Sequence, residues 1–282
     1  GAMAARTADA FRERGLRTET WFATADEMKE YLEHVGEQPG YEGRLNVYGT
    51  RAGSGGGRSM MLNAHIDTVP EGDHALWSQP PFAANLVDGK VYGRGSCDMK
   101  GGLVTHLAAL DALSAIGVTL KGDVSVAATV GEEDGGLGAL STVLRGKRAD
   151  AVLVTEPTEL ALVTACEGSL VFRITITGRS AHAATRDEGV SALEKFLPIF
   201  ADLQAFEKER NATLRHPLYD VFPNKVPINV GVVRAGNWAS TVPELLEAEV
   251  RVGLLPGEEL QWFKRYVTDR IMTAAARDPW LT

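Results

Sequence analysis

Residues 60–67 read MMLNAHID, a short apolar run that leads directly into a histidine and an aspartate. The run follows a Gly-rich turn at residues 53–57 and predicts a strand. Further strand-like runs occur at residues 124–130 and 151–154, and apolar residues recur at helical spacing over 103–116. Buried strands that alternate with helices predict an α/β fold with a mostly parallel sheet covered on both faces.

The pattern changes around Cys166. Strands are predicted at residues 170–177, 228–233 and 246–252, and helices at 190–210 and 258–276. This β-α-β-β-α order is one strand short of a ferredoxin-like α+β module. We therefore expect two domains, residues 1–167 and residues 168–282.

Composition excludes several classes of partner. Lysine and arginine total 29 against 37 acidic residues, which gives a formal net charge of −8 and opposes binding to nucleic acid or an anionic membrane. The two cysteines, Cys97 and Cys166, have the spacing of neither a zinc knuckle nor a disulfide framework, and they predict free thiols. No apolar stretch is long enough to span a bilayer, and no signal peptide is evident. We expect a cytoplasmic protein.

Acidic and histidine residues cluster where the predicted strands end or a helix begins. They are His65, Asp67, Asp98, Glu132, Glu133 and Glu156. Because the carboxyl ends of strands in an open α/β sheet face one crevice, we expect these side chains to meet there. Burying so many carboxylates together is prohibitive without cations to neutralise them. The pattern therefore predicts a metal centre.

The spacing suggests separate roles within this centre. His65 and Asp67 are two residues apart, so on a strand Asp67 can accept the second imidazole N–H and fix the ligating tautomer. Glu132 and Glu133 are adjacent, so their side chains diverge, and one can ligate while the other takes a proton from water. Histidine and carboxylate ligands without cysteine favour zinc, with cobalt or manganese as substitutes.

Structural interpretations compete with each of these roles. His65 alone could be a hydrogen-bonded core histidine, and the two glutamates could form a solvated loop. Asp98 could cap the helix that follows it, a role compatible with metal ligation. We assign no functional role to four other histidines, which are His34, His74, His216 and, in the helix at residues 103–116, His106.

Four segments resemble the signature blocks of a known enzyme family. They read HIDTVP at residues 65–70, GRGSCDMKGG at 93–102, GEE at 131–133 and TEPT at 155–158. In this order they are similar to the di-zinc peptidase family of acetylornithine deacetylase, succinyl-diaminopimelate desuccinylase, glutamate carboxypeptidase and aminoacylase. The resemblance extends over nearly the whole chain.

The resemblance implies a role for each matched residue. His65 and Glu156 would hold one zinc ion, Asp98 would bridge two ions, and Glu133 would hold the second. Glu132 would be the general base. A cis peptide bond between Asp98 and Met99 is also implied.

The resemblance further implies that residues 168–282 form a lid that makes a homodimer. Residues 178–183, GRSAHA, resemble the lid block whose histidine, here His182, polarises the substrate carbonyl in the partner subunit's active site. A purely structural turn is the alternative for His182. Residues 235–243 resemble a second lid block, in which Ser240 replaces the asparagine of many relatives and leaves that substrate contact open.

The predicted function is zinc-dependent hydrolysis of the amide bond of an N-acyl amino acid, in the manner of a deacetylase or desuccinylase, or of a short peptide. A metal-bridged hydroxide would attack the carbonyl after Glu132 takes its proton, in an active site that holds two zinc ions when complete. Alternatives from other classes are a non-catalytic dimerising relative and a di-metal phosphoesterase.

The metal beside Glu133 needs a nitrogen ligand of its own. The histidines that follow Glu156 are His182 and His216, and both fall in the predicted lid. We therefore expect the hydrolase domain to be incomplete in its C-terminal part and the second metal site of this 282-residue chain to be weak.

Overall fold

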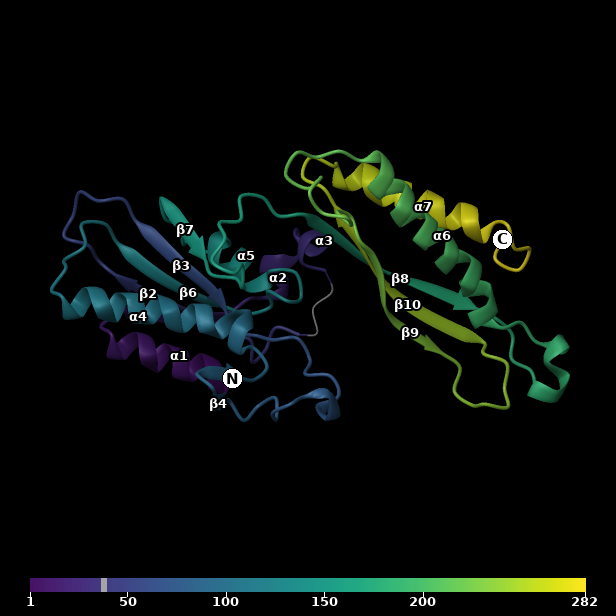
Figure 1. Ribbon diagram of the computed structural model, residues 1–282, viewed down its shortest axis with the longest axis horizontal. Helices are drawn as coiled ribbons and strands as arrows, with labels where there is room; N and C mark the ends of the chain where they lie inside the picture. The colour runs from purple at the N-terminus through teal and green to yellow at the C-terminus, as the bar shows by residue number, and fades with distance from the viewer. Residues whose placement is uncertain (37–39) are drawn as a thin grey trace. The chain divides into compact units, whose positions relative to one another are not determined.

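The computed structural model describes residues 1–36 and 40–282 of the chain. The chain divides into two compact units, Gly1–Leu162 and Val163–Thr282, and each is described by itself. The division falls a few residues before the boundary predicted between residues 167 and 168. Figure 1 labels the helices and strands of both units.

The first unit is built on a five-stranded sheet in the order β1-β2-β6-β3-β7. In that order the strands are Arg17–Phe22, Leu45–Arg51, Val124–Thr129, Met60–His65 and Ala151–Val154. The β6–β3 and β3–β7 pairs are parallel, whereas β1–β2 and β2–β6 are antiparallel. The fold is thus α/β as predicted, but the sheet is mixed rather than mostly parallel.

The connections along the chain explain this difference. A parallel pair requires a crossover of a dozen or more residues, usually through a helix. Residues 52–59 alone join β2 to β3, too short a connection for a crossover, and β2 runs opposite to β3 and β6. Helices α4 (Gly101–Ala115) and α5 (Leu137–Leu144) lie in the β3–β6 and β6–β7 connections, which makes those strands parallel.

Helices cover the sheet with apolar side chains. Helix α1 (Ala2–Glu13) and α4 lie side by side, and Phe11, Leu107 and Leu110 are buried with strand residues in one cluster (Figure 1). A separate cluster contains Trp21, whose Nε1 donates a hydrogen bond of 3.0 Å to Ser141 Oγ of α5. The sheet therefore has a core on each face.

Short elements complete the first unit. They are α2 (Ala25–Met28), α3 (Leu32–Val35), the 3₁₀ turn His74–Leu76, the two-stranded sheet of β4 (Asn85–Val87) and β5 (Lys90–Tyr92), and the π-helical turn η2 (Ser96–Lys100). Turn η2 runs directly into α4. The helix that was predicted at residues 103–116 is thereby joined to the segment that contains Asp98.

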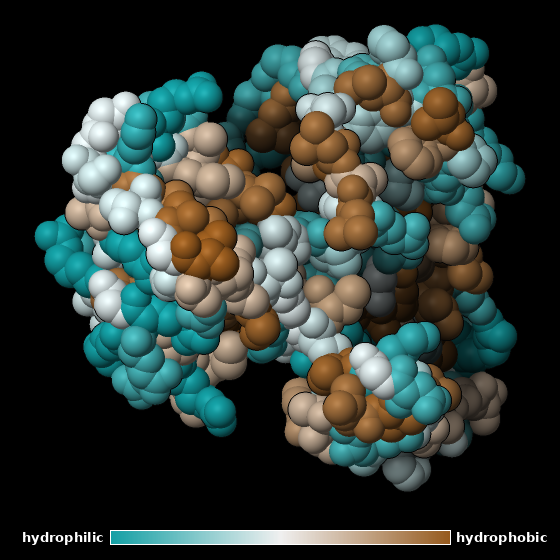
Figure 2. Space-filling view, turned by 60° about the vertical axis from the view of Figure 1, so that its left-hand side comes forward, coloured by the Kyte–Doolittle hydropathy of each residue, from teal (hydrophilic) through white to brown (hydrophobic). Residues whose placement is uncertain are grey.

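Strand β7 departs from the prediction in one respect. It forms at residues 151–154 as predicted, but it is exposed rather than buried: Val152 and Val154 are 56% and 50% exposed. The reason is its position at the end of the sheet, where within the described residues it pairs with β3 alone. Figure 2 shows apolar side chains, in brown, open to solvent on the face that it presents.

The second unit has the predicted order of elements. Strand β8 (Gly168–Thr177) is followed by α6 (Ala192–Thr213), β9 (Ile228–Ala235), β10 (Leu245–Leu254) and α7 (Leu260–Ala275), with the 3₁₀ segment Ala183–Glu188 between β8 and α6. The sheet order is β8-β10-β9 with antiparallel pairing throughout. Phe196 and Phe206 of α6, Phe263 of α7 and Val250 of β10 share one buried cluster.

A buried ion pair ties α6 to the segment between β10 and α7. The Arg210 guanidinium donates hydrogen bonds of 2.8 and 2.6 Å to the two carboxylate oxygens of Glu258, and one of 2.6 Å to the Gly253 carbonyl. The guanidinium carbon of Arg210 lies 4.4 Å from the centroid of the Phe263 ring. Among the described residues, no helix of either unit is both long enough and apolar enough to cross a bilayer.

Candidate metal centre

His65 is the last residue of β3, and its side chain is fully buried. Its Nδ1 lies 3.2 Å from the Asp67 carbonyl oxygen and 3.5 Å from Asp67 Oδ1, and its Nε2 lies 2.8 Å from Asp98 Oδ1. Burial opposes protonation of the imidazole, yet the hydrogen bonds to Asp67 and Asp98 raise its pKa to about 9. The surroundings of the ring therefore favour a positive charge.

Asp67 lies beyond the end of β3, because the strand stops at His65. The predicted strand geometry for this pair is therefore wrong, although the two residues are in contact. Asp67 reaches the ring mainly through its backbone carbonyl, while its Oδ2 accepts a 3.4 Å hydrogen bond from the Glu133 amide. Within the described part of the chain Asp67 Oδ1 is buried without a hydrogen-bond partner.

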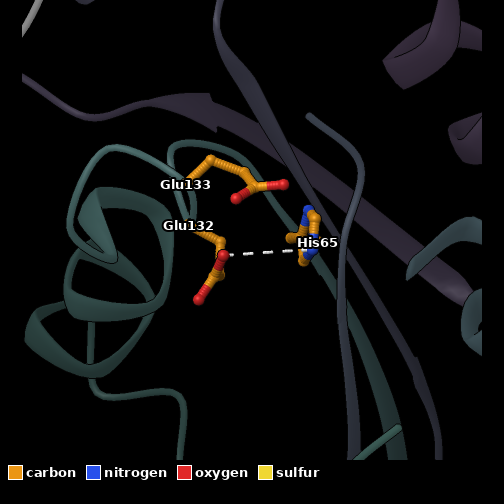
Figure 3. A group of neighbouring side chains, drawn as sticks. All are labelled: His65, Glu132 and Glu133. Carbon is orange, nitrogen blue, oxygen red and sulfur yellow. Dashed lines mark ion pairs between the residues drawn. The ribbon is translucent and has the colours of Figure 1, made fainter. Parts of the chain in front are cut away.

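Glu132 and Glu133 lie in the turn that follows β6. With His65 they form a set whose possible ligand atoms all lie within 4.8 Å of one another. The distance from His65 Nε2 to Glu132 Oε2 is 3.9 Å, drawn as the dashed line in Figure 3. Figure 3 also shows the two carboxylates pointing in different directions, as expected for adjacent residues.

A second set of possible ligands consists of His65, Asp98 and Glu156, again within 4.8 Å. Asp98 lies in η2, and Glu156 lies two residues beyond β7. The Asp98–Met99 peptide bond is cis, which confirms that prediction. The residue before α4, Lys100, makes no side-chain capping hydrogen bond, and the Asp98 carboxylate contacts His65.

The carboxylates of the two sets are crowded. Burial, followed by the charges of Glu132 and Asp98, raises the pKa of Glu156 to about 7 against the opposing effect of His65. Burial raises the pKa of Glu132 too, and Glu133, Asp67 and Asp98 add to it. Carboxylates that are costly to ionise together, around one imidazole, are suited to a divalent cation that would neutralise them. The residues therefore fit a site for a divalent metal ion.

His182 belongs to the second unit. Its Nδ1 accepts a 3.1 Å hydrogen bond from the Ala184 amide and so caps the following 3₁₀ segment. The backbones of His182 and Thr241 form an isolated β-bridge, and the Ala183 amide donates to the Ser240 carbonyl at 2.9 Å. The two sequence blocks predicted to belong to a lid therefore lie against each other.

Sequence reasoning missed two residues beside the metal centre. One is Lys100, where burial lowers the pKa of the ammonium group. The negative charges of Asp67, Asp98 and Glu133 raise this pKa, but the effect of burial is larger. His106 of α4, treated as ordinary, is 2% exposed and lies 3.1 Å from the hydroxyl of Thr155, the residue before Glu156. The available signal for His106 was its place among the leucines of the apolar helix face.

Comparison with known proteins places these residues in a wider context. Residues 61–271 match the family described as Peptidase family M20/M25/M40. The N-formyl-4-amino-5-aminomethyl-2-methylpyrimidine deformylase of Halalkalibacterium halodurans is 30% identical over 234 residues, which are 79% of this chain and 54% of that protein. An acetylornithine deacetylase of Erwinia tasmaniensis is 31% identical over 247 residues, 86% of this chain and 61% of that protein. The chain thus spans little more than half the length of these relatives.

Solved structures share the fold. The dipeptidase Dug1p from Saccharomyces cerevisiae superposes with a TM-score of 0.72 at 13% identity, covering 97% of this chain and 68% of that one. Human carnosine dipeptidase 1 superposes with a TM-score of 0.69 at 14% identity, covering 98% of this chain and 68% of that one. The metallo-carboxypeptidase Sso-CP2 from Sulfolobus solfataricus superposes with a TM-score of 0.68 at 15% identity, covering 96% of this chain and 70% of that one.

Proposed function

The chain belongs to Peptidase family M20/M25/M40, and from this premise we propose that it provides the metal-binding and proton-transfer residues of a hydrolase that cleaves linear amide bonds. The observation that carries the proposal is the position of His65, which belongs to both carboxylate sets at the ends of the strands. Gathering these carboxylates around one buried imidazole would not stabilise a protein core, because burying charged groups is costly.

We propose zinc as the metal, with cobalt or manganese as substitutes, because the ligand set combines imidazole nitrogen with carboxylate oxygen. His65, Asp98 and Glu156 would hold one ion, and Glu133 would contribute to a second, with Asp98 between them. Bound zinc supplies a Lewis acid and lowers the pKa of water. Asp67 orients the imidazole by its contact with Nδ1.

Glu132 is the proposed general base. Its carboxylate lies 3.9 Å from His65 Nε2, and its pKa is raised by burial and by neighbouring acids, which favours a group that accepts a proton and gives it back. In amide hydrolysis Glu132 would take a proton from the attacking water and return it to the leaving amine. A glutamine at this position could fill the same space but could not carry the proton.

The proposed substrate is an N-acyl amino acid, with a short peptide as the second choice. The names of the two curated relatives, a deformylase and an acetylornithine deacetylase, support a short acyl group. For the second unit we propose a lid that forms a homodimer and presents His182 to the substrate carbonyl. The two free thiols support the cytoplasm as the proposed location.

Metal binding and substrate choice test the proposal together. The purified chain would be titrated with Zn²⁺, and then incubated at high concentration with N-formyl, N-acetyl and N-succinyl amino acids, dipeptides and phosphate esters. We expect zinc binding that depends on His65 and release of amine from acyl amino acids. Faster hydrolysis of phosphate esters would identify a phosphoesterase instead, and absence of zinc binding would leave only a dimerising relative, detectable by light scattering.

A further inference from the structure

His106 is a buried polar residue that the proposed chemistry does not use. It lies on the apolar face of α4 with Leu103, Leu107 and Leu110, and the residue is 2% exposed. Its Nε2 lies 3.1 Å from Thr155 Oγ1, while Nδ1 is buried with no hydrogen-bond partner among residues 1–36 and 40–282. A leucine would occupy this position without leaving a polar atom unpaired, so the imidazole costs stability where it lies.

Thr155 lies at a position where the sheet no longer holds the backbone. The last pair of the β3–β7 ladder is Asn63 with Val154, and β7 is the end strand of the sheet. Thr155 and Glu156 therefore follow β7 and have no partner in that ladder. Helix α4 approaches this segment closely. A Cβ atom on Gly102 would collide with the hydroxyl and the carbonyl of Thr155. Gly102 and His106 are one helical turn apart and together form a seat for Thr155.

The same helix continues from the segment that contains Asp98. Turn η2 ends at Lys100, and α4 begins at Gly101 without a break in the chain. Asp98 therefore lies in the turn that leads directly into α4, and the residue that His106 contacts is the immediate neighbour of Glu156. These two carboxylates belong to one candidate ligand set with His65, although they come from distant segments of the chain.

We propose that His106 is a positioning residue, which holds Thr155 against α4 and so fixes Glu156 relative to Asp98 for cation binding. The inference rests on the metal centre of the proposed function. Burial lowers the pKa of His106, so the ring is neutral and carries one proton. That proton is on Nε2 and is donated to Thr155 Oγ1, because a buried N–H without a partner is rarer and costlier than an unpaired acceptor.

Cobalt binding provides a readout that does not depend on turnover. The visible absorption of Co²⁺ reports the coordination geometry, and competition with Zn²⁺ gives both affinities. His106→Leu removes the donor at similar volume, and Thr155→Val removes the acceptor at similar shape. Loss of such an outer contact weakens metal binding roughly 10- to 100-fold. We expect the affinity of each variant for Co²⁺ to be lower than that of the wild-type chain by a factor within this range, and the Co²⁺ spectrum to change.

Conservative and double variants separate positioning from general packing. His106→Gln and Thr155→Ser keep a donor and an acceptor, so they should restore most of the affinity and the spectrum. The double variant His106→Leu/Thr155→Val should bind Co²⁺ no more weakly than either single variant, because the two substitutions remove the same hydrogen bond. Thr155 is only partly buried, so its two variants decide the question if His106→Leu does not fold.

Two results would overturn the inference, and one of them would spare the proposed function. If His65→Ala loses cobalt while His106→Leu and Thr155→Val keep wild-type affinity and spectrum, His106 serves packing alone. If His65→Ala binds cobalt as the wild-type chain does, the metal centre itself is wrong, and the positioning role fails with it.

Discussion

His65 is the residue on which both candidate ligand sets depend. We predict that His65→Ala loses bound zinc, because the nitrogen ligand of both sets disappears. Glu132→Gln should retain zinc nearly unchanged while abolishing turnover, because Glu132 is assigned to proton transfer. Elemental analysis of the dialysed proteins measures the metal, and His74→Ala, at an exposed histidine paired with Glu71, is the matched control. Equal metal loss in both site variants would show that Glu132 is a ligand.

At the same scale, the sequence alone located the acidic cluster because strand ends converge at one edge of an α/β sheet. That rule applies to His65, Glu132 and Glu133, which directly follow apolar runs. It could not show that Asp67 contacts the ring through a carbonyl, since this depends on where β3 stops. Nor could it reveal the contact of His106 with Thr155, which exists only once α4 packs against the segment that follows β7.

At the scale of elements, the buried pair of Arg210 and Glu258 gives a prediction about stability. Their side chains are 5% and 14% exposed. Glu258→Ala leaves a buried guanidinium without its carboxylate, a change that costs about 3–5 kcal/mol. Urea unfolding of the whole chain, followed by circular dichroism, should show the second unit unfolding at lower denaturant concentration.

The exposed pair of Arg186 and Glu194 is the control for this prediction. Both side chains are more than half exposed, and such pairs contribute at most about 1 kcal/mol. Arg186→Ala should therefore unfold close to the wild-type chain. A Glu258→Ala variant as stable as Arg186→Ala would mean that α6 is held by its apolar cluster alone.

Strand predictions succeeded where apolar residues repeat and failed where pairing decides. The run at residues 151–154 does form β7, yet its apolar composition predicted burial, and only the sheet order shows that it lies at an edge. Strand β1 was missed because residues 17–22, RTETWF, are largely polar. Its pairing with β2, rather than its own composition, makes it a strand.

At the scale of the whole chain, the exposed β7 predicts surface behaviour. Apolar side chains on an unpaired strand edge bind hydrophobic dyes and promote association. Val152→Lys should lower the fluorescence of bound anilinonaphthalene sulfonate and reduce association in light scattering, without a change in circular dichroism. Val118→Lys replaces a similarly exposed valine outside any strand and should alter dye binding less. Equal dye binding by the wild-type chain and Val152→Lys would contradict this prediction.

Zinc stoichiometry is the last property that follows from the whole arrangement. In the part of the chain that the structure describes, one imidazole belongs to both ligand sets, and its Nδ1 is already engaged by Asp67. Nε2 can ligate only one ion, so the other ion would have carboxylate ligands alone. Because zinc sites in proteins usually include nitrogen or sulfur ligands, we predict that this 282-residue chain binds one Zn²⁺ tightly and a second much more weakly.

Calorimetric titration of chelator-treated protein should therefore resolve two steps, with a lower affinity in the second step. Glu133→Gln should weaken the second step and leave the first nearly unchanged, whereas Glu156→Gln should weaken the first, because these carboxylates fall in different sets. Asp134→Asn, beside Glu133 but in neither set, controls for the loss of one negative charge. Two ions bound with equal, high affinity would mean that the centre has a nitrogen ligand other than His65.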